Sequence, residues 1–384
     1  MPKIHNRVLL TLCCAAGAAL SGGSFLNHAP NRLANASPVP VWEAPPLDVA
    51  AIVIALVVSV GLAFVPRAKL RSIATFTAAA LLFCACLIAA GDLARSLSTP
   101  LFPSARQSPG TGFWITIGVA LLAMFDALQR IRLPLSQRAL FLLGPGLAFL
   151  ILARIGILDE LSLAKEFSAH RSLFMGELQR HLLLVAAAIA LSLAIGVPLA
   201  VLTLRGKTAR TSVLTVLGLV QTIPSIALFA ILIVPLSALA AHLPFLALWG
   251  VSGTGPAPAI IALCLYALLP LVRNIATGFS EVPEDVKEVA QGLGFSERQM
   301  FLRVELPLAM PACLSGLRIV TVQAIGLATL AALIGAGGLG TFVFQGIGQY
   351  ALDLVLLGAL PVILLAFAAD FGFQLLLTRL RGYA

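Results

Sequence analysis

Ten long apolar runs, each almost free of charge, constrain this chain more than any other feature of its sequence. An apolar run of about 20 residues can cross the hydrocarbon layer of a membrane as an α-helix, whereas a transmembrane β-barrel would alternate apolar and polar residues in segments of about ten. The composition agrees, because 60% of the residues are hydrophobic and only 11% are charged, too few for the polar surface of a soluble domain. The predicted fold class is therefore all-α, a polytopic transmembrane helical bundle of about 10 spans. The runs lie at residues 8–25, 48–65, 71–91, 113–129, 137–157, 180–203, 212–234, 257–276, 312–334 and 352–377.

The basic residues orient these spans. With the N-terminus in the cytoplasm and the spans alternating, 18 of the 25 Lys and Arg residues fall on the cytoplasmic side, Arg318 near the start of the ninth run among them. Cytoplasmic loops carry such an excess, which explains the net charge of +9 without nucleic acid. We expect a multi-pass protein of the plasma membrane (the bacterial inner membrane) with cytoplasmic N- and C-termini. Lys3 and Arg7 before the first run also fit a cleaved signal peptide, and that alternative stays open.

A charge-dense segment, residues 158–179, divides the chain. Residues 1–157 hold five spans with little internal polarity and are interpreted as an accessory N-terminal transmembrane region. The segment itself is interpreted as an extracytoplasmic linker or surface helix. Residues 180–384 hold five spans interrupted by prolines, glycines and polar residues, and are interpreted as the working core. The Pro-containing external loops 27–47 and 98–112 are expected to be irregular.

A polar insert, residues 281–311, interrupts the core on its cytoplasmic side. Pro283 suits the start of a helix, where no amide donor is needed. Gly292 or Gly294 can end that helix in a left-handed conformation, and the insert is expected to be hinged at Gly294.

A second short helix follows in the insert. Ser296 and Gln299 fit a capping box at its start, and Pro307 is expected to stop it. The two helices can share an apolar surface made of Val286, Val289, Ala290, Leu293, Met300, Phe301 and Val304.

The insert resembles the EAA loop of ABC-importer permeases, which reads Glu-x-Ala-x-x-x-Gly and, nine residues later, a segment ending in Leu-Pro. Val289 and Val304 stand where that family usually has alanine and isoleucine. The resemblance implies a coupling helix that docks into a groove of an ATPase, with Glu288 in polar contact with the ATPase and Gly294 permitting the turn. The ATPase-coupling residues that it implies are Glu288, Ala290, Gly294, Leu306 and Pro307.

The surrounding spans resemble the type I, binding-protein-dependent (MetI-like) permeases for glycine betaine, choline and related osmoprotectants. HLLLVAAAIALSLAIGVPLAVL (181–202) and TVQAIGLATLAALIGAGGLGTFVFQGI (321–347) carry this resemblance, which covers about 172–384. It implies that 180–384 form an ABC transmembrane type-1 permease domain with about five spans. The implied partners are ATP-binding ABC subunits, an extracytoplasmic solute-binding protein, a second permease copy or paralogue, and membrane lipids.

Polar residues within the core spans have two interpretations. They either line the translocation path or form interhelical hydrogen bonds that only hold the bundle. Pro224 is expected to kink the seventh run. The candidate path residues are Gln221, Thr222, Pro224, Ser225, Thr321, Gln323 and Thr329.

Residues 335–340, GAGGLG, match a dinucleotide-binding pattern, but no strand–turn–helix surrounds them. They are interpreted either as a flexible turn or as a gate-adjacent bend where glycine permits close helix approach. The glycines are Gly335, Gly337, Gly338 and Gly340.

No nucleotide, metal or catalytic site is expected in this chain. Arg205-Gly206-Lys207-Thr208 contains GKT, but Val201 stands where a P-loop needs its first glycine. ATP and Mg are therefore expected in the partner ATPase. The chain itself is expected not to be an enzyme; it is expected to be the permease subunit of an importer for glycine betaine or related quaternary-ammonium osmoprotectants.

Asp370 lies deep in the last run, with Arg379 and Arg381 not far away. Because a carboxylate at that depth also suits an ion-coupled carrier, a stand-alone secondary carrier or channel remains an alternative, as does a membrane anchor or sensor.

Overall fold

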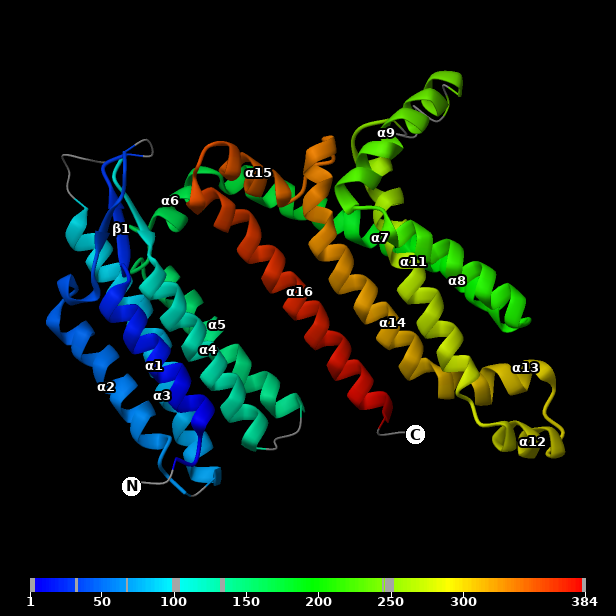
Figure 1. The fold of residues 1–384 in the computed structure, drawn as a ribbon, viewed down its shortest axis with the longest axis horizontal. Coiled ribbons are helices and arrows are strands. Elements are labelled where there is room, and N and C mark those ends of the chain that lie inside the picture. The colour runs from blue at the N-terminus through cyan, green and yellow to red at the C-terminus, as the bar shows by residue number, and fades with distance from the viewer. Residues whose placement is uncertain are drawn as a thin grey trace. The chain divides into compact units, whose positions relative to one another are not determined.

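The computed structural model describes residues 4–31, 34–66, 68–98, 104–131, 135–243, 245 and 252–381. The chain divides into two compact units, unit 1 (Met1–Ala169) and unit 2 (His170–Ala384), and the division falls within the charge-dense segment 158–179 of the sequence (Figure 1). Over the described residues, seven helices are long and apolar enough to cross a membrane, and three shorter apolar helices accompany them. The predicted all-α, polytopic fold is confirmed, and a small sheet is added to it.

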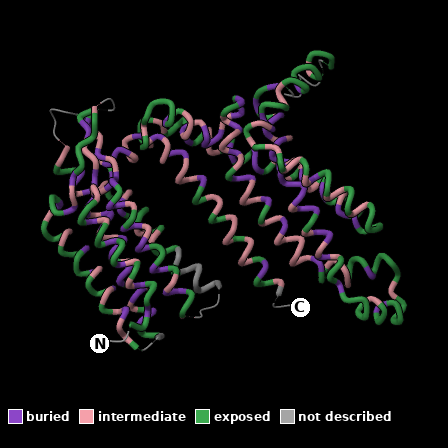
Figure 2. Tube along the Cα trace, viewed as in Figure 1, coloured by how far each residue is buried: buried purple, intermediate pink, exposed green. Residues whose placement is uncertain are grey.

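Unit 1 is a bundle of helices that bury their apolar faces against one another (Figure 2). Leu9, Ile52, Leu93 and Met124, from four different helices, are each 1% exposed, so the core runs through the whole bundle. The helices are α1 (Arg7–Gly22), α2 (Pro46–Leu62), α3 (Ala68–Leu97), α4 (Thr111–Ile131), α5 (Leu135–Arg154) and α6 (Ser162–Ala169).

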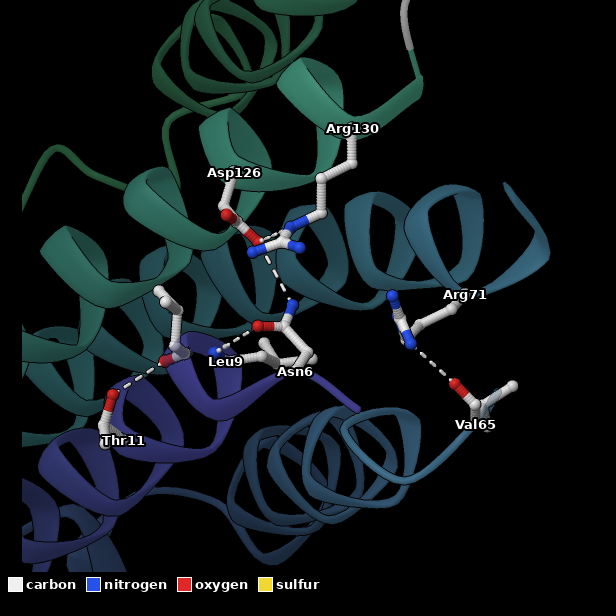
Figure 3. A network of polar contacts seen from close by, with 8 residues as sticks. Asn6, Leu9, Thr11, Val65, Arg71, Asp126 and Arg130 are labelled. Carbon is white, nitrogen blue, oxygen red and sulfur yellow. Dashed lines mark hydrogen bonds and ion pairs between the residues drawn. The ribbon is translucent and has the colours of Figure 1, made fainter. Parts of the chain in front are cut away.

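A polar network joins α1 to α4 at one end of unit 1 (Figure 3). The side-chain oxygen of Asn6 accepts a hydrogen bond from the Leu9 amide at 3.1 Å, which caps α1. The Asn6 amide nitrogen donates to Asp126 of α4 at 3.1 Å, and Arg130 donates to the same carboxylate at 2.8 Å. One carboxylate therefore ties a helix cap to the neighbouring helix.

A three-stranded antiparallel sheet lies in unit 1, with β1 (Leu26–Ala29) between β2 (Ser37–Val39) and β3 (Arg106–Pro109). Leu26 pairs with Val39 on one side and with Pro109 on the other. The expectation that 27–47 and 98–112 are irregular is wrong at these strands. Strands of three or four residues are too short for the alternation of apolar and polar residues by which a strand is recognised in a sequence.

The turn before α6 is held by charge. Lys165 Nζ lies 2.8 Å from the Glu160 carboxylate, and the Ser98 hydroxyl donates to that carboxylate at 2.8 Å. The hydrogen bond from Lys165, followed by that from Ser98, lowers the pKa of Glu160. The Ser162 hydroxyl donates to the Gln107 carbonyl at 2.9 Å and fastens α6 to β3.

In unit 2 long helices surround α11, and a short insert projects beyond them (Figure 1). A β-carbon on Gly278 of α11 would lie 2.8 Å from Ala312 Cβ, and one on Gly316 of α14 would lie 2.6 Å from Asn274 Cβ. Glycine on both helices therefore lets α11 and α14 cross closely. The elements of unit 2 are α7 (Arg171–Leu204), α8 (Lys207–Thr222), α9 (Ser225–His242), α11 (Pro256–Ser280), α12 (Glu284–Gly292), α13 (Glu297–Met300), the π-helical segment η2 (Phe301–Glu305), α14 (Leu306–Leu327), the 3₁₀ segment η3 (Ala328–Ile334), α15 (Gly340–Gly348) and α16 (Leu352–Arg381).

The run 212–234, predicted as one kinked span, is two helices. α8 ends at Thr222, Ile223 is extended with ψ 128°, and α9 begins at Ser225. The residue before a proline is pushed out of the helical region by the proline ring. Pro224 therefore breaks this segment instead of kinking it.

Candidate functional site

The insert of unit 2 is a pair of short helices, α12 and α13, that continues through η2 into α14. Pro283 is the N-cap of α12, one position before the first helical turn. Glu284 and Asp285 lie in that first turn, where negative charge favours the helix dipole. The Lys287 ammonium group lies 3.3 Å from the Glu284 carboxylate and 3.7 Å from the Glu305 carboxylate of η2. One ammonium group therefore joins α12 to η2.

Gly294 closes α12. Its φ is +78°, its amide donates to the Gln291 carbonyl at 2.9 Å, and the Phe295 amide donates to the Ala290 carbonyl at 3.1 Å. These two bonds form a Schellman motif, which needs a left-handed residue at this position. Of the two glycines predicted as possible helix ends, Gly294 takes the role, and Gly292 is the last residue of α12.

The predicted capping box at the start of α13 is present. The Ser296 amide donates to Gln299 Oε1 at 2.9 Å, and the Gln299 amide donates to Ser296 Oγ at 3.4 Å. The turn at Gly294 therefore has hydrogen bonds on both sides, which satisfy backbone groups at the end of α12 and at the start of α13.

The apolar residues of the insert face two ways. Val289 and Leu293 are 64% and 72% exposed, and Val286 on the same face of α12 is 38% exposed. Ala290 and Met300 are buried inside the insert instead. The predicted single apolar surface therefore splits into an inner pair and an outer face, and Glu288 lies exposed beside that outer face.

The expectation that Pro307 stops the second helix is wrong. The chain stays helical from α13 through η2 into α14, and Pro307 lies in the first turn of α14. A proline ring would clash with the carbonyl four residues earlier in a regular α-helix. The wider π turn just before it, where the Leu306 amide donates to the Phe301 carbonyl, relieves that clash.

The insert is anchored on α11. The rings of Phe279 and Phe301 stack with centroids 5.6 Å apart and planes 2° apart. A cavity of about 490 Å³ lies between α11 and α14, close in the sequence to both residues of the stacked pair. Asn274, Thr277 and Glu281 are among its lining residues. Movement of the insert would therefore reach α11 and α14 directly.

The break between α8 and α9 is bound to α11. Gln221 Nε2 donates to the Tyr266 carbonyl at 2.8 Å, and the Tyr266 hydroxyl donates to the Ile223 carbonyl. The Tyr266 carbonyl lacks its helical donor because Pro270 stands four residues later. The carbonyls of Tyr266 and Ile223 both lie where a proline interrupts the helical hydrogen bonding. The contact between Gln221 and Tyr266 supplies a hydrogen-bond donor to each of them.

Of the other predicted path residues, Thr222, Pro224 and Ser225 adjoin this contact in the chain, whereas Thr321, Gln323 and Thr329 lie on α14 and η3. The hydroxyls of Thr222, Thr321 and Thr329 donate to carbonyls three or four residues earlier in their own helical segments. Gln323 is half-buried on α14, and Ser225 is the first residue of α9. The structure therefore brings Gln221, Thr222, Pro224 and Ser225 together at one break and leaves the α14 and η3 residues as a separate set.

The glycine turn after η3 is held by α7. Gly335, Gly337 and Gly338 all have φ between +75° and +91°. Glu177 of α7 accepts hydrogen bonds from the Gly338 amide and, at 3.4 Å, from the Thr341 hydroxyl.

Gly340 begins α15, and a β-carbon there would collide with the Thr329 carbonyl. Together with the bonds from Glu177, this close approach makes 335–340 a fixed turn.

Arg318 of α14 and Asp370 of α16 form an ion pair that the charge count does not anticipate. Arg318 Nε lies 2.6 Å from Asp370 Oδ1, and Nη2 lies 2.9 Å from Oδ2. Arg318, which we assigned to the cytoplasmic side, lies twelve residues into α14, and it pairs with Asp370 in place of Arg379 and Arg381. A carboxylate already paired in this way gives no support to an ion-coupled carrier.

Sequence reasoning missed Tyr266, Glu177 and the role of Arg318. Pro270 was a usable signal for Tyr266, because a proline inside a helix always leaves the carbonyl four residues earlier without its donor. The fold brings Glu177 and Arg318 to partners that are far away in the sequence, and no residue spacing predicts either pair.

Two family models match the chain. Residues 6–164 match "ABC transporter permease YehY, N-terminal domain". Residues 172–382 match "Binding-protein-dependent transport system inner membrane component". The boundary between the two matches lies next to the boundary between units 1 and 2.

Relatives match the second half of the chain. The osmoprotectant import permease protein OsmW of Salmonella typhimurium is 42% identical over 50% of this chain and 84% of its own length. The glycine betaine/carnitine/choline transport system permease protein OpuCB of Bacillus subtilis is 37% identical over 50% of this chain and 81% of its own. A solved structure titled "Inward facing conformations of the MetNI methionine ABC transporter" covers 55% of this chain and 98% of that one, with 21% identity and a TM-score of 0.48.

Proposed function

Because this chain belongs to the family of binding-protein-dependent transport system inner membrane components, we propose that it carries glycine betaine or a related quaternary-ammonium osmoprotectant in an ATP-driven importer. The chain is a multi-pass inner membrane protein and the translocation subunit of an ABC importer, a transport component and not an enzyme. The solute class is taken from the names of the relatives, one an osmoprotectant permease and one a glycine betaine/carnitine/choline permease.

The observation that carries the coupling role is the exposed apolar face of α12. Val286, Val289 and Leu293 form a stripe along α12, whose C-terminal end is closed by the Schellman hydrogen bonds at Gly294. Apolar side chains exposed on a polar insert are stabilised by a protein partner. We assign that partner as the ATPase, and the residues proposed to act in coupling are Glu288, Ala290, Gly294, Leu306 and Pro307.

The partners follow from this assignment. Separate ATP-binding ABC subunits hold ATP and Mg, an extracytoplasmic binding protein delivers the solute, and a second permease copy or a paralogue completes the pathway. Both termini and the insert lie in the cytoplasm, as the basic residues favour.

Transport is then driven through the insert. ATP binding closes the ATPase dimer and draws the two inserts together, and the stacked pair Phe279–Phe301 passes this movement to α11. For ATP to drive the permease between inward-open and outward-open states, the ATP-bound ATPase must bind one of the two states more tightly than the other. The proposed path residues are Gln221, Thr222, Pro224, Ser225, Thr321, Gln323 and Thr329, and the proposed gate-adjacent glycines are Gly335, Gly337, Gly338 and Gly340.

Proteoliposome uptake of labelled glycine betaine tests the proposal. We expect uptake only when the cognate ATPase, the binding protein and ATP are all present. Uptake that persists without the ATPase would establish the stand-alone carrier or channel instead, and no uptake with all components present would contradict the solute class.

A further inference from the structure

The ion pair between Arg318 and Asp370 is the least expected polar feature of unit 2. On α14 apolar residues surround Arg318 from 308 to 320, apart from Ser315, and on α16 the residues from 354 to 369 before Asp370 are apolar. Charges within an apolar span are costly, and they usually face a bundle interior or a water-filled path. The pair therefore calls for a role beyond holding two helices together.

The pair is not covered by the rest of the chain. The side chains of Arg318 and Asp370 keep 30% and 34% of their surface exposed. Lipid hydrocarbon offers no hydrogen-bond partner to the exposed part of the guanidinium and the carboxylate, so exposure of the pair to lipid would be costly. The exposed part of the pair therefore needs water or another polar group as a partner within the assembled transporter.

Aromatic rings flank the carboxylate on the same face. Phe367 and Phe371 of α16 stack with centroids 6.4 Å apart and planes 11° apart. Phe367, Asp370, Phe371 and Gln374 follow the spacing i, i+3, i+4, i+7, which places them on one side of the helix. Phe367 is 52% exposed, so part of this stacked pair is accessible on the side of α16 that bears the carboxylate.

This chemistry suits one class of small molecule. A quaternary ammonium is attracted by aromatic faces and by a carboxylate, and a guanidinium binds a carboxylate through two parallel hydrogen bonds. We propose that Arg318, Asp370, Phe367 and Phe371 form a low-affinity solute site within the membrane, which takes a zwitterion that carries a quaternary ammonium and a carboxylate.

Binding exchanges one ion pair for two. The ammonium of the solute lies against Asp370 and the two rings, and its carboxylate takes the Arg318 fork that Asp370 occupies in the empty site. When no solute is bound, the two protein charges neutralise each other, which lowers the free-energy cost of placing them in an apolar span. A purely cationic solute such as choline would use the Asp370 side and leave Arg318 without a carboxylate. This inference rests on the proposed function and assigns part of the solute selectivity to the permease.

The test measures binding without the binding protein. Labelled glycine betaine and labelled choline are titrated onto the purified permease–ATPase complex in nanodiscs, with scintillation proximity as the readout. Arg318→Gln should weaken glycine betaine about 10-fold or more and should spare choline, because Asp370 then keeps its charge and the hydrogen bond from Gln374 but has lost its cationic partner on α14. Phe371→Leu keeps the ion pair and should weaken both solutes roughly 2-fold to 30-fold. Thr378→Val, whose hydroxyl donates to the Gln374 carbonyl one turn further along α16, is the control and should bind as the wild type does.

Exchange of the two charges distinguishes a solute site from an ion pair that only holds α14 and α16 together. Arg318→Asp with Asp370→Arg restores an ion pair between α14 and α16 but moves the cation next to the two rings. We expect a folded complex that binds both solutes at least about 10-fold more weakly.

Wild-type binding of both solutes by the exchanged variant, or unchanged affinities in Arg318→Gln and Phe371→Leu, would overturn the site. So would a wild type that transports glycine betaine in the complete system but binds neither solute at millimolar concentration. A wild type that fails to transport at all would instead contradict the proposed function.

Discussion

Gln221 donates a hydrogen bond of 2.8 Å to the carbonyl of Tyr266, the carbonyl that Pro270 leaves without its helical donor. The Tyr266 hydroxyl returns a bond to the Ile223 carbonyl at the end of α8. The proline break between α8 and α9 and the proline in α11 are therefore joined at a single contact.

Loss of this contact should destabilise unit 2. Gln221→Leu leaves the Tyr266 carbonyl without a donor, and we expect a cost of about 0.5–2 kcal/mol, the range found for hydrogen bonds between membrane helices. Thermal unfolding in detergent measures it. Thr222→Val is the matched control, because the Thr222 hydroxyl donates to the Leu219 carbonyl within α8 itself. An equal loss in both variants would show that the contact with Tyr266 has no special weight.

Gly294→Ala should disturb the insert, while Gly292→Ala should not. Both positions have open space for a β-carbon, but Gly294 has φ +78° and Gly292 is helical. An alanine forced into the left-handed region costs roughly 1–2 kcal/mol, whereas alanine in a helix is favoured over glycine by about 1 kcal/mol. We expect weaker association with the ATPase for Gly294→Ala alone, measured by co-purification. Reduced association in Gly292→Ala as well would contradict the turn as the cause.

Gly340→Ala should destabilise the fold, because its β-carbon would collide with the Thr329 carbonyl. A forced backbone shift of this kind typically costs about 1–3 kcal/mol. Gly348→Ala, at the end of the same helix and with nothing within 4 Å, is the control. The melting temperature should fall only for Gly340→Ala. An unchanged melting temperature there would mean that η3 and α15 move apart readily.

Glu288→Lys should separate ATP hydrolysis from transport. Glu288 is exposed beside the outer face of α12, so the change should leave the permease folded and membrane-inserted. If Glu288 makes a polar contact with the ATPase, reversing its charge replaces attraction with repulsion and should lower glycine betaine uptake several-fold. Glu297→Lys, at an exposed position of α13, serves as the charge-matched control. Full uptake by Glu288→Lys would remove Glu288 from the coupling residues.

The sequence predicted best those features that depend on neighbouring residues. The capping box at Ser296 and Gln299 and the left-handed turn at Gly294 follow from local hydrogen-bond rules, and both were predicted. Pro307 was judged by the same local rules and wrongly, because the π turn at 301–305 depends on how the insert joins α14 and no residue type marks it.

Contacts between distant segments could not be predicted. The pairing of Arg318 with Asp370 joins residues 52 apart, and Glu177 meets Gly338 across 161 residues. Counting basic residues by span placed Arg318 outside the membrane, because the positive-inside rule averages over loops and cannot see a single arginine paired within a bundle.

The central claim is that the outer face of α12 docks the ATPase, and one pair of variants tests it most directly. Leu293→Asp puts a charge on the exposed apolar face, while Gln291→Asp puts the same charge on the opposite side of the same helix. Co-purification with the ATPase and ATP-dependent glycine betaine uptake are measured for both. We predict that Leu293→Asp loses the ATPase and at least about 10-fold of the uptake, and that Gln291→Asp keeps both. Wild-type association and uptake in Leu293→Asp would contradict the claim.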